Sequence, residues 1–221
     1  MNTPLLALRD VTFGYDPDRP VFRRISIEIG AGDRMALMGR NGAGKTTLLH
    51  LLVGLLRPQT GRVEAFGRVC RVEADFLPVR RRVALLFQDS EDQLFCPTVL
   101  EDAAFGPLNL GHPPGEARRL AMEALDRVGM SAYADRITHH LSVGEKKLIA
   151  LATILSMQPA VLLLDEPTAG LDEAAVERVV ALLAGLDAAQ LIVSQDAAFL
   201  ARVTRRRAIL GHEMNIEEVN R

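Results

Sequence analysis

A glycine-rich segment near the N-terminus carries the residues best suited to do chemistry. It reads Gly39, Arg40, Asn41, Gly42, Ala43, Gly44, Lys45 and Thr46, followed by Thr47. The spacing G-x-x-x-x-G-K-[S/T], after an apolar run and before a helix-like segment, is typical of a loop whose backbone N–H groups surround polyphosphate. We expect Lys45 to reach the terminal phosphates and the Thr46 hydroxyl to ligate Mg²⁺. A merely tight glycine turn is the alternative, but it gives no reason for Lys45, Thr46 and Thr47 at the start of an apolar helix.

Two adjacent carboxylates, Asp165 and Glu166, follow the apolar run 161–164 and precede Pro167. Such a run is typical of a buried parallel strand, and parallel sheets place their ligand sites at the carboxyl ends of the strands. A helix cap explains one carboxylate at this point but not two. We therefore expect Asp165 to hold Mg²⁺ through water and Glu166 to polarise an attacking water as general base.

A third segment, 141–147, reads LSVGEKK. Taken alone, Ser142 followed by Glu145 predicts a helix capping box. The order of the three motifs, however, resembles the nucleotide-binding subunit of an ATP-binding-cassette (ABC) transporter, whose signature reads LSGGQ. The resemblance covers nearly the whole chain, from Tyr15 to the last expected strand, and implies an ATPase that uses ATP and Mg²⁺.

The resemblance also implies site residues outside the three motifs. Tyr15 takes the position of the aromatic residue that stacks on adenine, with a tyrosine in a surface turn as the alternative. Gln88 matches the glutamine that touches Mg²⁺ and the attacking water, and it leads into the segment that contacts the membrane subunit. The segment 169–172, which reads AGLD, matches the loop that crosses the dimer interface.

In this family two subunits enclose two ATP molecules, so the resemblance implies a composite site. Ser142 and Gly144 of one chain would face the γ-phosphate held by Lys45 of the other, and Glu145 beside them is a further candidate nucleotide-binding residue. The resemblance leaves open whether the working dimer is a homodimer or a heterodimer with a related ATPase subunit.

The sequence departs from the family pattern at three positions. Val143 and Glu145 stand where the signature usually has glycine and glutamine, and Gln195 stands where the family has its switch histidine. Glutamine can donate a neutral hydrogen bond to the γ-phosphate but carries no positive charge. Because loss of a charge-stabilising donor typically costs about 3 kcal/mol, we expect hydrolysis that is slow but real.

The segment 87–111, which reads FQDSEDQLFCPTVLEDAAFGPLNLG, indicates a subfamily. It is similar to the corresponding stretch of energy-coupling-factor ATPases, which drive uptake of cobalt, nickel, biotin and other vitamins. This similarity implies a subunit that docks peripherally, on the cytoplasmic face of the membrane, onto a transmembrane coupling protein and a small substrate-binding membrane protein. The cargo itself is not written in the sequence, since an ATPase that never touches it has no reason to encode its chemistry.

Strands and helices alternate around these motifs, which predicts an α/β fold. Strands are expected at 6–11, 21–29, 34–38, 61–66, 83–87, 161–164, 191–193 and 208–210, and helices after Thr98, after Pro114, at 173–186 and at 197–203. We predict a P-loop NTPase core with a mainly parallel sheet and an N-terminal antiparallel β subdomain, formed by 1–89 and 160–221. Residues 90–159, which include the signature, are predicted to form an inserted α-helical subdomain of the same domain.

Composition excludes several other classes of protein. Lys and Arg total 26 and Asp and Glu total 28, a net charge of −2, so no global basic excess points to nucleic acid as a partner. The arginine groups at 80–82 and 205–207 are expected to be solvated or paired with carboxylates. The longest apolar stretch, 148–157, is much shorter than a membrane span. A translation-associated ABC ATPase, a DNA-associated ABC ATPase and a small-molecule kinase are the alternatives; the first normally carries two cassettes, the second a long coiled coil, and the third lacks the signature.

Overall fold

The structure is a computed structural model that describes residues 3–210. Of these, 3–83, 160–163 and 187–210 form one compact unit (unit 1), and 84–159 and 164–186 form a second (unit 2). The domain boundaries expected at residues 90 and 159 stay a prediction.

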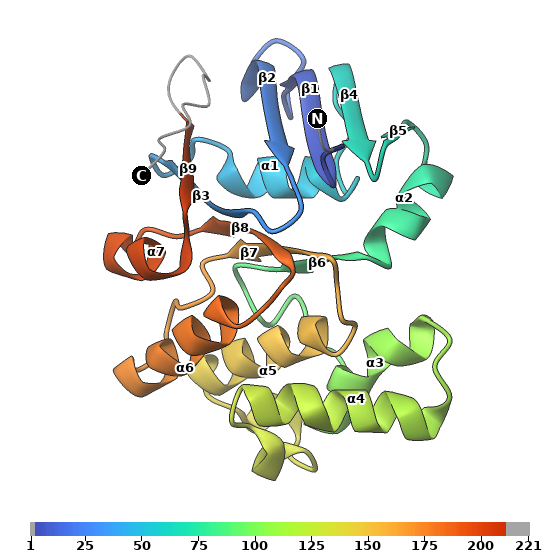
Figure 1. The fold of residues 1–221 in the computed structure, drawn as a ribbon, viewed down its shortest axis with the longest axis vertical. Coiled ribbons are helices and arrows are strands. Elements are labelled where there is room, and N and C mark those ends of the chain that lie inside the picture. The colour runs from blue at the N-terminus through green and yellow to red at the C-terminus, as the bar shows by residue number, and fades with distance from the viewer. Residues whose placement is uncertain (1–2, 211–221) are drawn as a thin grey trace. The chain divides into compact units, whose positions relative to one another are not determined.

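Unit 1 contains a four-stranded antiparallel sheet in the order β2-β1-β4-β5 (Figure 1). Its strands are β1 (Leu6–Phe13), β2 (Phe22–Ile29), β4 (Thr60–Ala65) and β5 (Arg68–Cys70). In β2 the side chains of Ile25, Ile27 and Ile29 are buried and those between them are exposed, which is the period of two that a half-buried strand requires. The predicted antiparallel β subdomain is therefore confirmed.

A second sheet has five strands in the order β6-β7-β8-β3-β9. The strands are β3 (Arg34–Gly39), β6 (Val83–Leu86), β7 (Val161–Asp165), β8 (Ala189–Val193) and β9 (Arg206–Leu210). Strand β3 runs parallel to both of its neighbours, β8 and β9. Every residue of β7 and β8 is buried, as expected of parallel strands covered on both faces. These findings confirm the mainly parallel sheet of the predicted α/β fold.

The described helices of unit 1 are α1 (Lys45–Leu52), α2 (Glu73–Arg80) and α7 (Ala197–Val203). The sequence did not predict α2 or β5. Pro78 lies inside α2 and removes one helical N–H donor. The helix forms nevertheless, because the Asp75 carboxylate accepts hydrogen bonds from the backbone nitrogens of Arg71 and Val72 at 2.7 and 3.0 Å and so closes its first turn.

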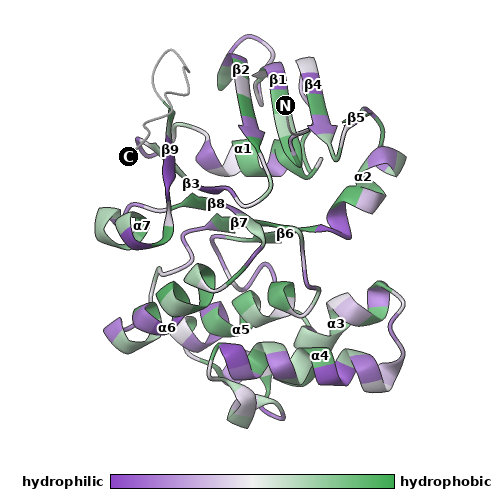
Figure 2. Cartoon of the chain, viewed as in Figure 1, coloured by the Kyte–Doolittle hydropathy of each residue, from purple (hydrophilic) through white to green (hydrophobic). Residues whose placement is uncertain are grey.

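Unit 2 is mainly helical, with α3 (Val99–Asn109), α4 (Pro114–Arg127), α5 (Val143–Leu155) and α6 (Glu173–Ala184), and with 3₁₀ turns at Ser131–Tyr133 and Thr138–His140. Helix α3 packs against α4 and α5 (Figure 1). In α4 hydrophilic residues line one side of an amphipathic helix (Figure 2), and Ala117, Leu120, Ala121, Ala124 and Leu125 are buried. The start of α3 follows the expected capping box, since the backbone nitrogen of Thr98 donates to Glu101 at 3.0 Å.

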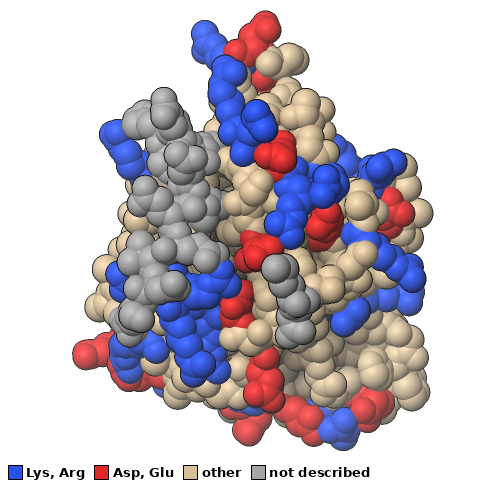
Figure 3. Space-filling model, turned by 45° about the horizontal axis from the view of Figure 1, so that its top comes forward, with Lys and Arg blue, Asp and Glu red and all other residues tan. Residues whose placement is uncertain are grey.

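One arginine in each of the two groups, Arg80 and Arg206, pairs with a carboxylate. Arg80 pairs with Glu73 and donates to the carbonyls of Val53 and Gly54, and Arg206 lies 2.5 Å from a carboxylate oxygen of Asp33. On the face shown in Figure 3, basic and acidic side chains are interspersed. Among residues 3–210, none of the helices combines the length and the apolar character that a membrane crossing needs.

Candidate functional site

The phosphate-binding loop predicted from the sequence lies between β3 and α1. Gly42 and Gly44 adopt left-handed backbone conformations, with φ of 78° and 94°. A Cβ atom added to Gly44 would lie 2.6 Å from Cγ1 of Val21, so this position accepts only glycine. The Lys45 Nζ donates to the carbonyls of Gly39 at 2.9 Å and Arg40 at 3.1 Å, which holds the ammonium over the loop. A glycine N-cap, a helix N-terminus and an ammonium above them form a cradle that fits a polyphosphate.

Tyr15 lies beside this loop within unit 1. Its hydroxyl is 3.0 Å from Oγ1 of Thr47, and its ring meets Phe13 edge to face with the centroids 5.1 Å apart. The Tyr15 side chain is 69% exposed, so a face of the ring is open to solvent. Both an adenine platform and a surface-turn tyrosine fit this geometry, and the adenine-stacking role stays a prediction.

Gln195 lies at the same edge of the sheet as the phosphate loop. Strand β8 pairs with β3 so that Val193 is opposite Leu37, and both strands end within two residues of that pair. The Gln195 residue is exposed, and the next residue, Asp196, caps α7 by accepting from the backbone nitrogen of Phe199 at 2.9 Å. The architecture of unit 1 thus brings the switch position to the edge where the loop begins.

The two adjacent carboxylates lie at the carboxyl end of β7. Asp165 is 2% exposed, whereas Glu166 is half-buried. Glu166 has a φ of 47°, a left-handed conformation that residues with a Cβ rarely adopt. Asp10, Arg24, Phe66 and Gln158 adopt the same conformation, so it is the position of Glu166 at the end of a buried parallel strand that makes it a candidate.

Gln88 follows β6 in unit 2, and its residue is exposed. Its carbonyl oxygen accepts a hydrogen bond of 2.6 Å from Nζ of Lys147, which is only 3% exposed. Sequence reasoning did not single out Lys147, because the motif 141–147 does not by itself show which of its two lysines is buried. The only available signal was the position of Lys147 beside the apolar residues of a helix.

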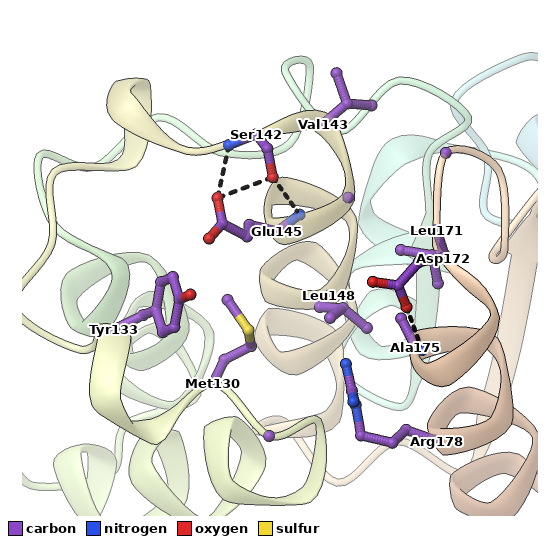
Figure 4. Close-up of a pocket in the computed structure, with 13 residues that line it drawn as sticks. Met130, Tyr133, Ser142, Val143, Glu145, Leu148, Leu171, Asp172, Ala175 and Arg178 are labelled. Carbon is purple, nitrogen blue, oxygen red and sulfur yellow. Dashed lines mark hydrogen bonds between the residues drawn. The ribbon is translucent and has the colours of Figure 1, made fainter.

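The signature segment forms the N-terminus of α5. The backbone nitrogen and hydroxyl of Ser142 each lie 2.8 Å from a Glu145 carboxylate oxygen, and the Glu145 nitrogen donates back to the hydroxyl at 3.3 Å (Figure 4). The capping box predicted from S-x-x-E is therefore confirmed. Glu145, which stands where the family usually has glutamine, therefore has a structural role as part of the helix cap.

A cavity of about 620 Å³ in unit 2 is lined by residues of both the signature and the 169–172 loop (Figure 4). Its lining residues are Gly129, Met130, Tyr133, Ser142, Val143, Gly144, Glu145, Leu148, Gly170, Leu171, Asp172, Ala175 and Arg178. Val143 is 69% exposed, and its Cγ1 would lie 3.2 Å from a Cβ atom added to Gly170. The unusual valine thus occupies space directly beside the loop that the sequence associates with the dimer interface.

Replacing Glu145 by Gln is expected to remove a pH-dependent part of the stability of the fold. Hydrogen bonds from the backbone and then the side chain of Ser142 hold the pKa of Glu145 below its ordinary value. The carboxylate therefore adds stability above its unfolded-state pKa, and this stability is lost as the pH falls through the folded-state pKa. Since the Gln amide oxygen still accepts from Ser142, the free energy of unfolding at neutral pH should change by less than about 1 kcal/mol. Urea unfolding at neutral and acid pH checks this: the difference between the two proteins should shrink in acid, and a constant difference would contradict it.

Comparison with known proteins assigns these features to one family. A model of the family described as ABC transporter matches residues 22–169. EcfA, an energy-coupling factor transporter ATP-binding protein of Methanothermobacter thermautotrophicus, is 41% identical over 211 residues, covering 94% of this chain and 68% of its own. CbiO, a cobalt import ATP-binding protein of Rhodobacter capsulatus, is 44% identical over 211 residues, covering 94% of this chain and 75% of its own.

A solved structure agrees with the sequence relatives. CbiO1 from Clostridium perfringens, part of the ABC transporter complex CbiONQ, matches with a TM-score of 0.86 at 31% identity, over 98% of this chain and 88% of that one. The likeness extends over nearly all of the chain, including the loop after β3, the end of β7 and the start of α5. The chain therefore belongs to the ABC transporter family, as an ATP-binding subunit that hydrolyses ATP.

Proposed function

We propose that this subunit drives a membrane importer of the energy-coupling-factor type and works on the cytoplasmic face of the membrane. The observation that carries the proposal is an apolar surface in unit 2, formed by Phe95, Phe105 and Leu108, which are 62%, 43% and 45% exposed. The two aromatic rings meet edge to face with centroids 4.7 Å apart. Exposed apolar side chains that are grouped in this way are typical of a surface that binds another protein.

The same surface lies in the segment that resembles energy-coupling-factor ATPases. Asp102, which is 3% exposed, accepts hydrogen bonds from the backbone nitrogens of Phe95 at 3.1 Å and Cys96 at 3.0 Å. Asp102, which directly precedes AAFG in the sequence, therefore fixes the loop that presents Phe95. We assign this surface to the transmembrane coupling protein, with a small substrate-binding membrane protein as the third kind of subunit.

The candidate site residues take the following roles in ATP hydrolysis. Lys45 and the phosphate-binding loop hold the polyphosphate, and Tyr15 contacts the adenine. Glu166 accepts the proton of the water that attacks the γ-phosphate, while Gln88 and Gln195 orient the water and the phosphate.

Three oxygen-bearing side chains suit Mg²⁺, which prefers hydroxyl, carboxylate and amide oxygens. They are the Thr46 hydroxyl at the start of α1, the Asp165 carboxylate at the end of β7 and the Gln88 amide after β6. Bound there, the ion would neutralise charge on the β- and γ-phosphates. Ser142, Gly144 and Glu145 contribute from a second ATPase subunit, either another copy of this chain or a related one.

Cobalt is the cargo to test first, because the relative from Rhodobacter capsulatus is named for cobalt import. Nickel and biotin are the other candidates. The decisive experiment is purification of the tagged chain from its native membranes with identification of the proteins that come with it. Recovery of a transmembrane protein and a small membrane protein supports the proposal, whereas recovery of ribosomes or DNA would favour the translation- or DNA-associated alternative.

Replacing Gln195 by His is expected to raise the ATPase rate of that assembled complex, and replacing it by Ala to lower the rate. An imidazolium adds charge stabilisation that a neutral amide lacks, and a donor of this kind is typically worth about 10²- to 10³-fold in rate, of which Gln retains part. Steady-state phosphate release by the three proteins checks the prediction. Equal rates in all three would remove Gln195 from the site.

A further inference from the structure

Lys147 is a lysine in the interior of unit 2. It lies in the second turn of α5, is 3% exposed, and is followed along the helix by the buried residues Leu148, Ile149 and Ala150. A buried ammonium is destabilising unless hydrogen bonds and charges compensate it. The Lys147 Nζ makes two such bonds, to the carbonyl oxygens of Gln88 at 2.6 Å and Phe87 at 3.3 Å.

Those two carbonyls belong to a stretch of backbone that has already left the sheet, since β6 ends at Leu86. A second side chain attaches the same stretch to the same helix. The Gln93 amide oxygen accepts from the backbone nitrogen of Phe87 at 3.2 Å, and its nitrogen donates to the Ala150 carbonyl at 2.8 Å and to Oγ1 of Thr153 at 2.9 Å. The backbone around Gln88 is thus held on α5 through Lys147 and through Gln93.

Nearby carboxylates, two of them proposed site residues, also act on the ammonium of Lys147. Burial lowers its pKa, and the carboxylates of Asp165, Asp89 and Glu166 act in the opposite direction by favouring the ammonium form. The side chain therefore lies within the electrostatic range of both carboxylates at the end of β7 while it fixes the backbone of Gln88. The sequence motifs assign no role to Lys147, either in holding the backbone of Gln88 or in acting on the carboxylates.

We propose that Lys147 is a positioning residue for ATP hydrolysis, which fixes the backbone of Gln88 to the helix that begins at Ser142. The inference rests on the roles proposed above for Gln88 and Glu166. By this connection, a displacement of the Gln88 segment displaces α5, and with it the signature residues at the N-terminus of the helix. Phe95 follows the same segment and belongs to the surface assigned to the membrane partner. A movement of that surface would therefore reach the signature through the Gln88 segment and α5.

The test compares Lys147→Met, which keeps the length and loses the donor, with Lys147→Arg, which keeps the charge and the donors. Lys146→Met is the matched control, because Lys146 is the neighbouring lysine and its ion pair is with Glu91, which is 69% exposed and so contributes little. For each purified full-length protein, at several protein concentrations, the measurements are kcat, the KM for ATP in the presence of Mg²⁺, and the midpoint of thermal unfolding.

We expect Lys147→Met to lower kcat at least tenfold with the KM for ATP within threefold of wild type. Its thermal midpoint should fall by no more than a few degrees, because removing the desolvation cost of the buried ammonium offsets part of the loss of its hydrogen bonds to the Gln88 and Phe87 carbonyls. Lys147→Arg should recover part of kcat, and Lys146→Met should behave as wild type. A purely structural lysine would instead lower the thermal midpoint and kcat together.

The outcomes separate this inference from the proposed function. If the wild-type chain turns over ATP and Lys147→Met does so within twofold of it, or if Lys146→Met loses as much as Lys147→Met, the positioning role is overturned. If Glu166→Gln is as active as wild type, it is the proposed catalytic assignment that fails. Failure to recover a membrane partner would remove the importer proposal and leave the role of Lys147 in hydrolysis standing.

Discussion

Replacing Glu166 by Gln is expected to stop ATP turnover while ATP stays bound. The amide has nearly the shape of the carboxylate but cannot take a proton from the attacking water, and loss of a general base typically lowers a rate by about 10²- to 10⁴-fold. Nucleotide binding should persist, because the phosphates are assigned to the loop after β3 and not to Glu166. The expected product is a chain that retains unhydrolysed ATP.

Phosphate release and the nucleotide retained after desalting measure this directly. Glu173→Gln is a suitable control, since Glu173 is an exposed carboxylate in the first turn of α6. Wild-type turnover in the Glu166 variant would refute its assignment as general base. Loss of ATP binding in that variant would show instead that the substitution disturbs the loop.

Replacing Lys45 by Ala is expected to weaken ATP binding by about 10²-fold or more. Charge-assisted hydrogen bonds contribute about 1.5–3 kcal/mol each, and the ammonium can make more than one with a polyphosphate. Within the described residues Lys45 donates to the carbonyls of Gly39 and Arg40, and both can be solvated when the ammonium is removed. The fold should therefore survive the substitution.

Equilibrium titration with a fluorescent ATP analogue checks the affinity, and thermal unfolding without nucleotide checks the fold. Arg23→Ala serves as the control for loss of one positive charge, because Arg23 is exposed on β2. An unchanged dissociation constant for Lys45→Ala would exclude the loop after β3 as the phosphate-binding site.

Local sequence signals predicted the parts of the structure that depend on neighbours along the chain. The capping boxes at Thr98 and Ser142 form as expected, because each depends only on a glutamate three residues further on. The loop predicted to bind phosphate has the required turn because its glycines Gly42 and Gly44 tolerate a positive φ. The alternation of strands and helices along the sequence was enough to indicate the α/β fold.

Features that depend on tertiary contacts were not predictable in this way. Strand β5 has three residues and exists through its pairing with β4, and α2 forms despite Pro78. The burial of Lys147 comes from the packing of α5 against the backbone that follows β6, and the closeness of Val143 to Gly170 comes from the position of the loop before α6. Lys147 and Gln88, like Val143 and Gly170, are far apart in the sequence, and no motif spacing relates the members of either pair.

The left-handed backbone of Glu166 has a consequence for how this chain evolves. A residue with a Cβ in that conformation costs of order 1–3 kcal/mol, part of which glycine at the same position would recover. Selection for stability alone would therefore favour glycine at position 166, and selection for turnover opposes it. A copy of this gene released from its catalytic duty would be expected to lose the glutamate early and to become more stable as it does so.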